Sequence, residues 1–215
     1  MGKLPVSNTV FVFDSVYDNE IEILRSMLNS AYKFDLNFVD PDMDLTALML
    51  AIVRRDNVMT NVLLEDERIK INTQNSEGCT ALMFACRYGD KYIVSKLLDM
   101  GATSETTDFQ YFCNPAHIAV LAGNLEVIEV LKQSAINWDV VDFQGDTPLH
   151  LAVLNDKPEI LISLLQLNNI NIHKKNKEGL TAYESAMERG NWQAINEFNE
   201  HIIRMNNMVS KEKNK

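Results

Sequence analysis

A short motif recurs five times along this chain of 215 residues at an almost constant interval. The copies begin at Thr46, Thr80, Asn114, Thr147 and Thr181, so that successive starts lie 34, 34, 33 and 34 residues apart. Each copy has alanine at its sixth position, and a second apolar run follows about ten residues after each start. A fixed period of this length predicts stacked helix pairs, because a single unit cannot bury its own apolar face.

The residues within each copy predict where its helices begin and end. The threonine or asparagine at the start is a favoured N-cap, because its side chain accepts hydrogen bonds from the free N–H groups of the first turn. Pro115 and Pro148 follow directly, at the position where a missing N–H costs nothing. A left-handed residue is expected to end each first helix, at Gly89, Gly123 and Gly190, or at Arg55 and Asp156 where glycine is replaced. In the second helices, Leu97, Leu131 and Leu164 are predicted to lie between neighbouring repeats.

Between one helix pair and the next, the sequence predicts an extended turn with a glycine at its tip, at Gly78, Gly145 or Gly179. The third hairpin departs from this pattern. It reads Asp108-Phe-Gln-Tyr-Phe-Cys113, which is one residue longer than the fourth hairpin and holds no glycine. Bulky aromatic residues therefore replace the residue that a tight turn favours.

One copy carries a full family signature. Residues 147–152 read Thr-Pro-Leu-His-Leu-Ala, which matches the T-P-L-H-x-A signature of the ankyrin repeat. Residues 114–119 keep the proline, the histidine and the alanine, whereas the other copies keep only the threonine and the alanine. Over about residues 40–198 the chain resembles the ankyrin-repeat family. The resemblance implies an all-α solenoid of stacked helix-turn-helix units with short β-hairpin loops.

The same resemblance divides the chain into consecutive segments. Residues 1–40 are expected to form a degenerate N-terminal capping repeat, with its second helix from Asn19 to Leu28. Ankyrin repeats are expected at 41–74, 75–107, 108–141 and 142–175, followed by a C-terminal capping repeat at 176–206. The extended last helix is predicted to end near Asn206, and residues 207–215 are predicted to be a disordered tail.

The charge and the cysteines limit the choice of partner and compartment. A net charge of −10 repels phosphate backbones, which excludes nucleic acid and favours a basic protein as the partner, unless the acidic surface only maintains solubility. Three cysteines form an odd set without metal-ligand spacing, which is typical of a reducing compartment. Neither a signal peptide nor an apolar run of membrane-spanning length is recognisable. The sequence therefore predicts a cytoplasmic or nuclear monomer without a membrane partner.

The sequence offers no pattern typical of catalysis, of a metal site or of a cofactor site. His, Cys and carboxylate residues lack zinc-ligand spacing, and neither G-x-S-x-G nor a phosphate loop is found. The family resemblance implies that His117 and His150 tie the turn together by hydrogen bonds. Cys86 is expected to be buried and inert, and Cys113 is expected to be exposed at its hairpin. We expect a protein that is not an enzyme and needs no cofactor.

The resemblance implies a protein-binding surface on the concave face of the array, built from hairpin tips and the exposed side of the first helices. Exposed aromatic residues and arginine at such positions are typical of interface hot spots. The candidate protein-binding residues are Arg87, Tyr88, Phe109, Gln110, Tyr111, Phe112, Leu121, Phe143, Gln144, Leu154 and Asn155. The expected function is that of a scaffold or adaptor that binds another protein.

Other interpretations stay open at this point. Phe109 and Phe143 are also able to stack against adjacent hairpins without meeting a partner. The chain as a whole is alternatively a structural spacer, or a fragment of a larger multidomain protein. Frequent Asn, Ile and Lys residues point to an AT-rich genome, such as that of an intracellular bacterium, a protist or a virus. An effector secreted into a host cytoplasm to act on host proteins is therefore a further hypothesis.

Overall fold

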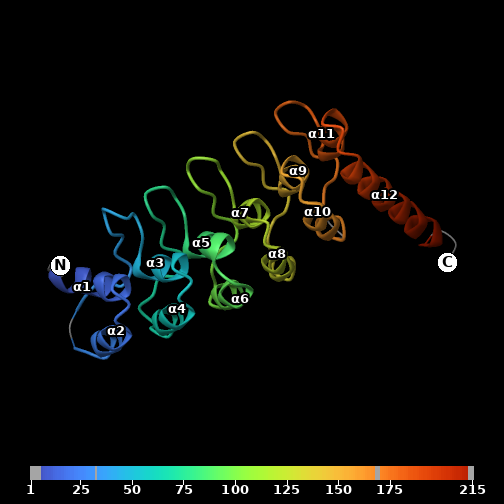
Figure 1. Cartoon of the computed structure of the whole chain (residues 1–215). Helices are drawn as coiled ribbons and strands as arrows, with labels where there is room; N and C mark the ends of the chain where they lie inside the picture. Colours follow the sequence, from blue (N-terminus) through green and yellow to red (C-terminus); the bar gives the residue numbers. More distant parts are fainter. Residues whose placement is uncertain (1–5, 32, 168–169, 213–215) are drawn as a thin grey trace. The chain divides into compact units, whose positions relative to one another are not determined.

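The computed structural model describes residues 6–31, 33–167 and 170–212, and over these residues it contains twelve helices (Figure 1). In place of a sheet, this part of the chain holds isolated β-bridges in its hairpins, at Asp40–Leu45, Gln74–Thr80 and Lys175–Thr181. The prediction of an all-α repeat fold with short hairpins is confirmed. The chain divides into two compact units, residues 1–109 and residues 110–215, which are described separately.

The first unit consists of three helix pairs. They are α1 (Val6–Tyr17) with α2 (Ile21–Leu28), α3 (Ala47–Val53) with α4 (Asn57–Leu64), and α5 (Ala81–Tyr88) with α6 (Lys91–Asp99). Each first helix packs against its own second helix, and α3 lies between α1 and α5. The core between the pairs is aliphatic, with Leu24, Met49, Leu63, Leu82 and Leu97 buried.

The second unit repeats this arrangement. Its pairs are α7 (Pro115–Ala122) with α8 (Leu125–Lys132), α9 (Pro148–Leu154) with α10 (Pro158–Leu164), and α11 (Ala182–Glu188) with α12 (Trp192–Glu212). The helix α9 packs between α7 and α11, and α10 contacts both α8 and α12. Leu131, Leu164 and Phe198 are fully buried between these layers.

The predicted N-caps are confirmed at all five motif positions. The side-chain oxygens of Thr46, Thr80, Asn114, Thr147 and Thr181 each accept a hydrogen bond from the backbone N–H three residues later. Each of these caps has an extended backbone conformation, as a residue that precedes a helix requires. The motif threonines and asparagine therefore fix where each first helix begins.

The predicted helix ends are confirmed except at Gly89. Gly123 and Gly190 are left-handed with φ of 74° and 64°, and Arg55 and Asp156 take the same conformation with φ of 57° and 51°. Gly89 instead is extended, with φ of −76° and ψ of −177°, so the expectation of a left-handed residue there is wrong. The residue that follows also differs: Asp90 is itself extended, with ψ of 166°, and its carboxylate accepts from two N–H groups of α6, whereas the caps Asp56 and Asn124, which follow left-handed residues, each accept from one. The chain therefore enters α6 directly from an extended segment.

The hairpins place a left-handed residue at each tip, and two of these residues are not glycine. Gly78, Gly145 and Gly179 have φ near 80°, whereas Asp44 and Phe112 hold the equivalent place with φ of 54°. The first hairpin, Asp40–Leu45, is thus long and without glycine, like the third. Neighbouring tips are joined by backbone hydrogen bonds, such as the one from the Phe109 N–H to the Glu77 carbonyl.

The two ends of the described chain differ from the expectation in length. At the N-terminal end, α1 and α2 form a complete helix pair. At the other end α12 continues to Glu212, so the predicted helix end near Asn206 and the predicted disorder at 207–215 are wrong for residues 207–212. The stretch from Asn199 to Glu212 contains neither glycine nor proline to stop the helix. Residues 213–215 lie outside the described residues.

Candidate functional site

Three aromatic side chains at two hairpin tips of the second unit form a surface that we call the aromatic patch: Tyr111, Phe112 and Phe143. Their exposed fractions are 48%, 53% and 39%. The rings of Tyr111 and Phe143 lie 5.7 Å apart at an interplanar angle of 57°, and the Phe143 N–H donates to the Tyr111 carbonyl at 2.8 Å. The two hairpins are therefore joined by both a backbone bond and a ring contact.

Phe112 occupies a conformation that is unfavourable for a bulky residue. Its φ of 54° lies in the left-handed region, where an L-residue costs roughly 1–2 kcal/mol relative to its usual conformation. At the equivalent tips of the second unit, Gly145 and Gly179 meet the same requirement without that cost. Strained, exposed aromatic residues of this kind are found preferentially at functional positions. Folding alone thus does not account for phenylalanine at residue 112.

The remaining candidate residues of the second unit lie beside these hairpins and on the first helices. Leu121 is exposed at the end of α7, and Leu154 is half-buried at the end of α9, which packs against α7. Gln110 and Gln144 are exposed on the hairpins, and the Gln144 carbonyl accepts a hydrogen bond from the Lys177 N–H at 3.0 Å. The exposed Asn155 donates its side-chain amide to the carbonyl of Leu151 in its own helix.

The other three candidate residues belong to the first unit. The Arg87 guanidinium lies over the Tyr88 ring, 5.3 Å from its centroid, and Tyr88 in turn stacks on Phe84. The Phe109 ring covers Gly78 so closely that a Cβ at Gly78 would lie 2.8 Å from the ring. Sequence reasoning combined these residues with those of the second unit into one surface, and the structure describes the two groups only separately.

Phe109 and Phe143 do pack against neighbouring hairpins, but both rings remain exposed to solvent. The Phe109 N–H donates to the Glu77 carbonyl at 2.8 Å, which holds the ring over the preceding tip. Phe143 makes the matching bond to Tyr111 in the second unit. Both phenylalanines nevertheless keep much of their surface in solvent. The contact with a neighbouring hairpin therefore orients each ring and leaves part of its surface exposed to solvent.

The motif histidines are structural, as the resemblance implies. His117 and His150 are almost completely buried. In His117, Nδ1 lies 2.7 Å from the Asn114 side-chain oxygen, and Nε2 lies 3.1 Å from the carbonyl of Asp146 in the next repeat. In His150, Nε2 lies 3.1 Å from the carbonyl of Leu180. Each imidazole thus connects its own helix cap to the hairpin of the following repeat.

The cysteines are unreactive by position. Cys86 is buried as expected, and burial raises its pKa. Cys113 is also buried, so the expectation of an exposed thiol at the hairpin is wrong. The hairpin turns at Phe112, and Cys113 points inward just before the cap of α7. Burial raises the pKa of the Cys79 thiol to about 11, and the negative charges of Asp108, Glu77 and Asp44 contribute to this shift.

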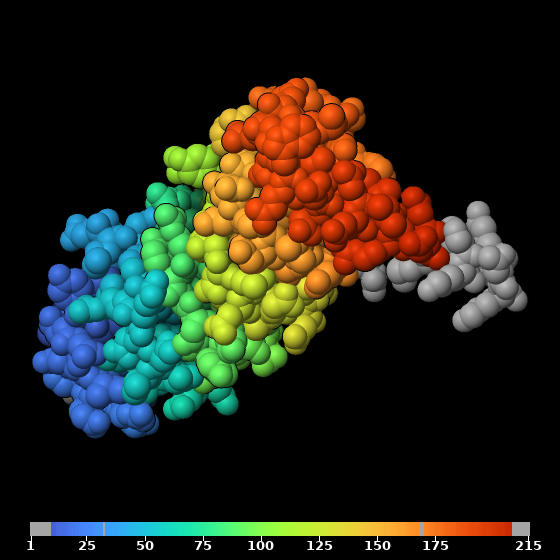
Figure 2. All heavy atoms as spheres, turned by 45° about the vertical axis from the view of Figure 1, so that its right-hand side comes forward, coloured from blue at the N-terminus to red at the C-terminus, as the bar shows by residue number. Residues whose placement is uncertain are grey.

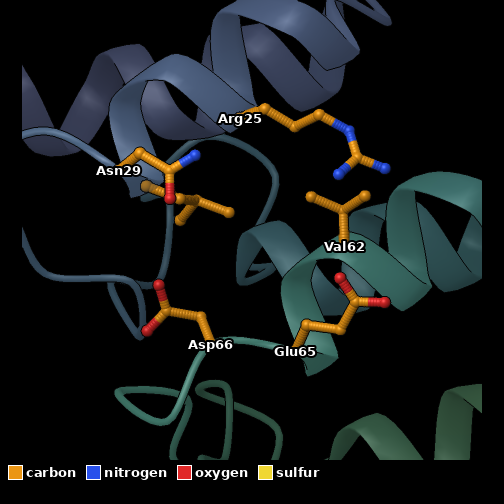
Figure 3. A pocket seen from close by; sticks show the side chains of 6 residues that line it. Arg25, Asn29, Val62, Glu65 and Asp66 are labelled. Atoms are coloured by element: carbon orange, nitrogen blue, oxygen red, sulfur yellow. The ribbon is translucent and has the colours of Figure 1, made fainter.

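A small cleft of about 130 Å³ lies between α2 and α4 in the first unit (Figure 3). Arg25 extends over Val62 towards Glu65, while Asn29 and Asp66 border the other side (Figure 3). Asp66 is already paired with Arg68 at 2.6 Å, and this hydrogen bond lowers the pKa of its carboxyl group. The cleft has room for only a few water molecules.

The described residues contain neither a metal-binding cluster nor a membrane-spanning helix. In that part of the chain, no three His, Cys, Asp or Glu side chains lie together in a way that could hold a metal ion. Likewise, among the helices of the described ranges none is both long and apolar enough to cross a bilayer.

Comparisons with known proteins agree with the fold. The family model described as ankyrin repeats (3 copies) matches residues 13–108 and 105–178. An ankyrin repeat protein of fowlpox virus (strain NVSL), FPV031, is 28% identical over 169 residues, which cover 76% of this chain and 50% of that protein. The human transient receptor potential cation channel subfamily A member 1 is 28% identical over 160 residues, covering 68% of this chain and 14% of the channel. The chain thus spans half or less of the length of these relatives.

A solved structure gives a similar result at the level of the fold. The crystal structure of the ankyrin repeat domain of Bcl-3, a member of the IkappaB protein family, matches with a TM-score of 0.76 and 21% sequence identity. The match covers 87% of this chain and 81% of the Bcl-3 chain. At this identity the likeness concerns the fold alone.

Proposed function

The chain belongs to the ankyrin-repeat family, whose repeats generally serve as protein–protein interaction modules, and from that premise we propose that it is a scaffold or adaptor that captures a partner protein. The proposed binding surface has the aromatic patch as its centre. Gln110, Leu121, Gln144, Leu154 and Asn155 surround the patch in the second unit, and Arg87, Tyr88 and Phe109 provide a further contact surface in the first.

The observation that supports this proposal most strongly is the third hairpin. Phe112 keeps a costly left-handed backbone and an exposed ring, although glycine would meet the backbone requirement at the same place. Tyr111 and Phe143 are held beside each other by main-chain and ring contacts, so little conformational entropy remains to be lost on binding. Rigid, exposed aromatic side chains are the usual centre of an interface hot spot.

The chemistry of the partner follows from the charge. A net charge of −10 favours a basic protein and disfavours nucleic acid. One copy is sufficient for this binding, because all three residues of the aromatic patch belong to one unit, and we expect the monomer to be the binding form.

We propose no catalytic activity, no cofactor and no membrane partner. We assign the protein to the cytoplasm or nucleus, because its odd set of cysteines suits a reducing compartment.

A second candidate function is supported by the lengths of the relatives. Since the matched relatives are at least twice as long as their matched region, the repeats are alternatively a spacer within a larger multidomain protein. The fowlpox relative also favours the hypothesis of an effector that acts on host proteins. In both cases the repeats support an activity that resides elsewhere, and the aromatic patch would then be dispensable.

The experiment that tests the first proposal compares capture of partner proteins by the wild-type chain and by the variants Tyr111→Ala and Phe112→Ala. The immobilised chain is incubated with lysate of the source cell, and captured proteins are quantified by mass spectrometry. We expect capture to weaken by about 2 kcal/mol, or roughly thirtyfold, with little change in melting temperature. Tyr92→Ala is the matched control, since Tyr92 is an exposed aromatic residue on α6 outside the proposed surface. A lower melting temperature with intact capture would support the spacer instead.

A further inference from the structure

The outer face of the first helix pair is an apolar groove that none of the described residues of the first unit fills. The groove runs between α1 and α2, has a volume of about 530 Å³, and is lined by Phe11, Ile23 and Met27. Phe11 and Ile23 are 58% and 48% exposed, although their neighbours Val12 and Leu24 are buried. This face therefore offers a packing surface for another helix at the end of the stack, where the first unit provides none.

The rim of this groove is acidic. Asp14, Asp18 and Glu20 border it, and residues 11–27 contain four acidic residues against one basic residue. That basic residue, Arg25, lies on the other side of α2, in the cleft above Val62 (Figure 3). A helix that fills the groove should therefore combine an apolar stripe with positive charge.

The same chain carries a helix of this description. The first half of α12 buries Ile195, Phe198 and His201, and this helix packs on α10 and α11. Residues 202–207 of the helix are exposed, with Ile202, Ile203 and Met205 in solvent. Figure 2 shows the red spheres of α12 reaching past the orange helices that precede it. Residues 201–215 include four basic residues and one acidic residue.

We propose that the exposed residues 202–207 of α12 in one copy dock into the α1–α2 groove of a second copy. The contact buries apolar side chains of both partners, and removing apolar surface from water is favourable. It also brings the positive charge of Arg204 to the acidic rim, which adds specificity and a dependence on salt. Such a head-to-tail contact leaves one groove and one helix free at the ends of each row of copies, so further copies can add until the two ends meet.

The first test is the molar mass of the full chain in solution. Sedimentation equilibrium from micromolar to millimolar concentration should give a weight-average mass that rises above 24.5 kDa with concentration. Because opposite charges meet in the contact, added salt should weaken the association. A mass that stays at that of one chain over the whole range would overturn the proposal.

A pair of variants tests the head-to-tail geometry. Ile23→Asp blocks the groove, and Ile202→Asp blocks the helix; both side chains are exposed, so circular dichroism and melting should show intact folding. Each variant alone should remain monomeric. An equimolar mixture should form a one-to-one dimer and nothing larger, because it contains only one intact groove and one intact helix per pair. Val58→Asp is the matched control, since Val58 is exposed on α4 outside the groove, and this variant should associate like the wild type.

Other contacts give different outcomes. If the Ile23→Asp or the Ile202→Asp variant still associates on its own, the contact does not join the groove of one copy to the helix of another. The head-to-tail proposal would then be wrong. In another outcome, the wild type is monomeric but Ile202→Asp increases hydrogen exchange in α2. The groove would then be occupied by α12 of the same chain, and docking of a second copy would be excluded. None of these residues belongs to the aromatic patch, so capture of a partner protein through that patch is measured independently.

Discussion

Truncation of Leu131 to alanine is the most direct test of how the second unit is held together. Leu131 is 0% exposed in α8, which packs against α7 and α10. Leu125 lies in the same helix, six residues earlier, and is 38% exposed. The two leucines therefore allow the same substitution in the same helix, once inside the stack and once at its surface.

The expected cost follows from the atoms that are removed. Leucine to alanine deletes three carbon atoms, and each buried carbon is worth roughly 0.8 kcal/mol, so the transfer contribution is about 2.4 kcal/mol. The cavity left between three helices adds to this, which brings Leu131→Ala into the range of about 3–5 kcal/mol. Leu125→Ala loses only part of the transfer contribution and leaves no enclosed cavity, so we expect about 1 kcal/mol or less.

Urea unfolding of both variants, monitored by far-UV circular dichroism, measures these costs. The free energy of unfolding should fall at unchanged urea dependence, because the substitutions alter stability and not the surface exposed on unfolding. Equal costs for the two variants, or a cost below about 1.5 kcal/mol for Leu131→Ala, would refute the idea that burial between repeats stabilises this unit.

Three further outcomes are expected. His150→Ala should lower the free energy of unfolding by about 1–3 kcal/mol, because the imidazole's hydrogen bonds to Thr147 and to the Leu180 carbonyl are lost; urea unfolding measures this. The thiolate of Cys79 should form only as the pH approaches its pKa of about 11, so alkylation of the folded protein should accelerate about tenfold per pH unit below that value. Burial lowers the pKa of His201, so the unfolded chain binds a proton more readily, and stability should fall as the pH drops through about 6.5. In His201→Gln this dependence should be weaker, as thermal melts at several pH values would reveal.

The period of the sequence was sufficient to predict the helices of the repeats. Caps such as Thr147 and prolines such as Pro148 act within a few residues, so their effect is local and readable from the chain alone. The left-handed Arg55 and Asp156 were also predictable, because the repeat fixes the backbone conformation at that place whichever residue is there.

The differences arise where the outcome depends on neighbouring residues. Gly89 is extended together with Asp90, whose carboxylate accepts from two N–H groups of α6, and the period does not contain that local difference. Cys113 is buried because the strained turn at Phe112 rotates the chain inward. The last helix continues past Asn206 because no glycine or proline stops it, whereas the lysine-rich end of the sequence had suggested disorder. The groove between α1 and α2 depends on the three-dimensional positions of two helices, which the repeat period does not contain.

The hairpins of the second unit are joined from main chain to main chain: Phe143 N–H to the Tyr111 carbonyl, and Lys177 N–H to the Gln144 carbonyl. Any residue except proline supplies both groups, so the bond survives almost every mutation at these tips. The exposed side chains at these tips can therefore vary without loss of the hydrogen bonds that hold the fold. Point mutations in a lineage that carries this gene can therefore change the exposed side chains of these tips, while the spacing of the helices behind them stays constant.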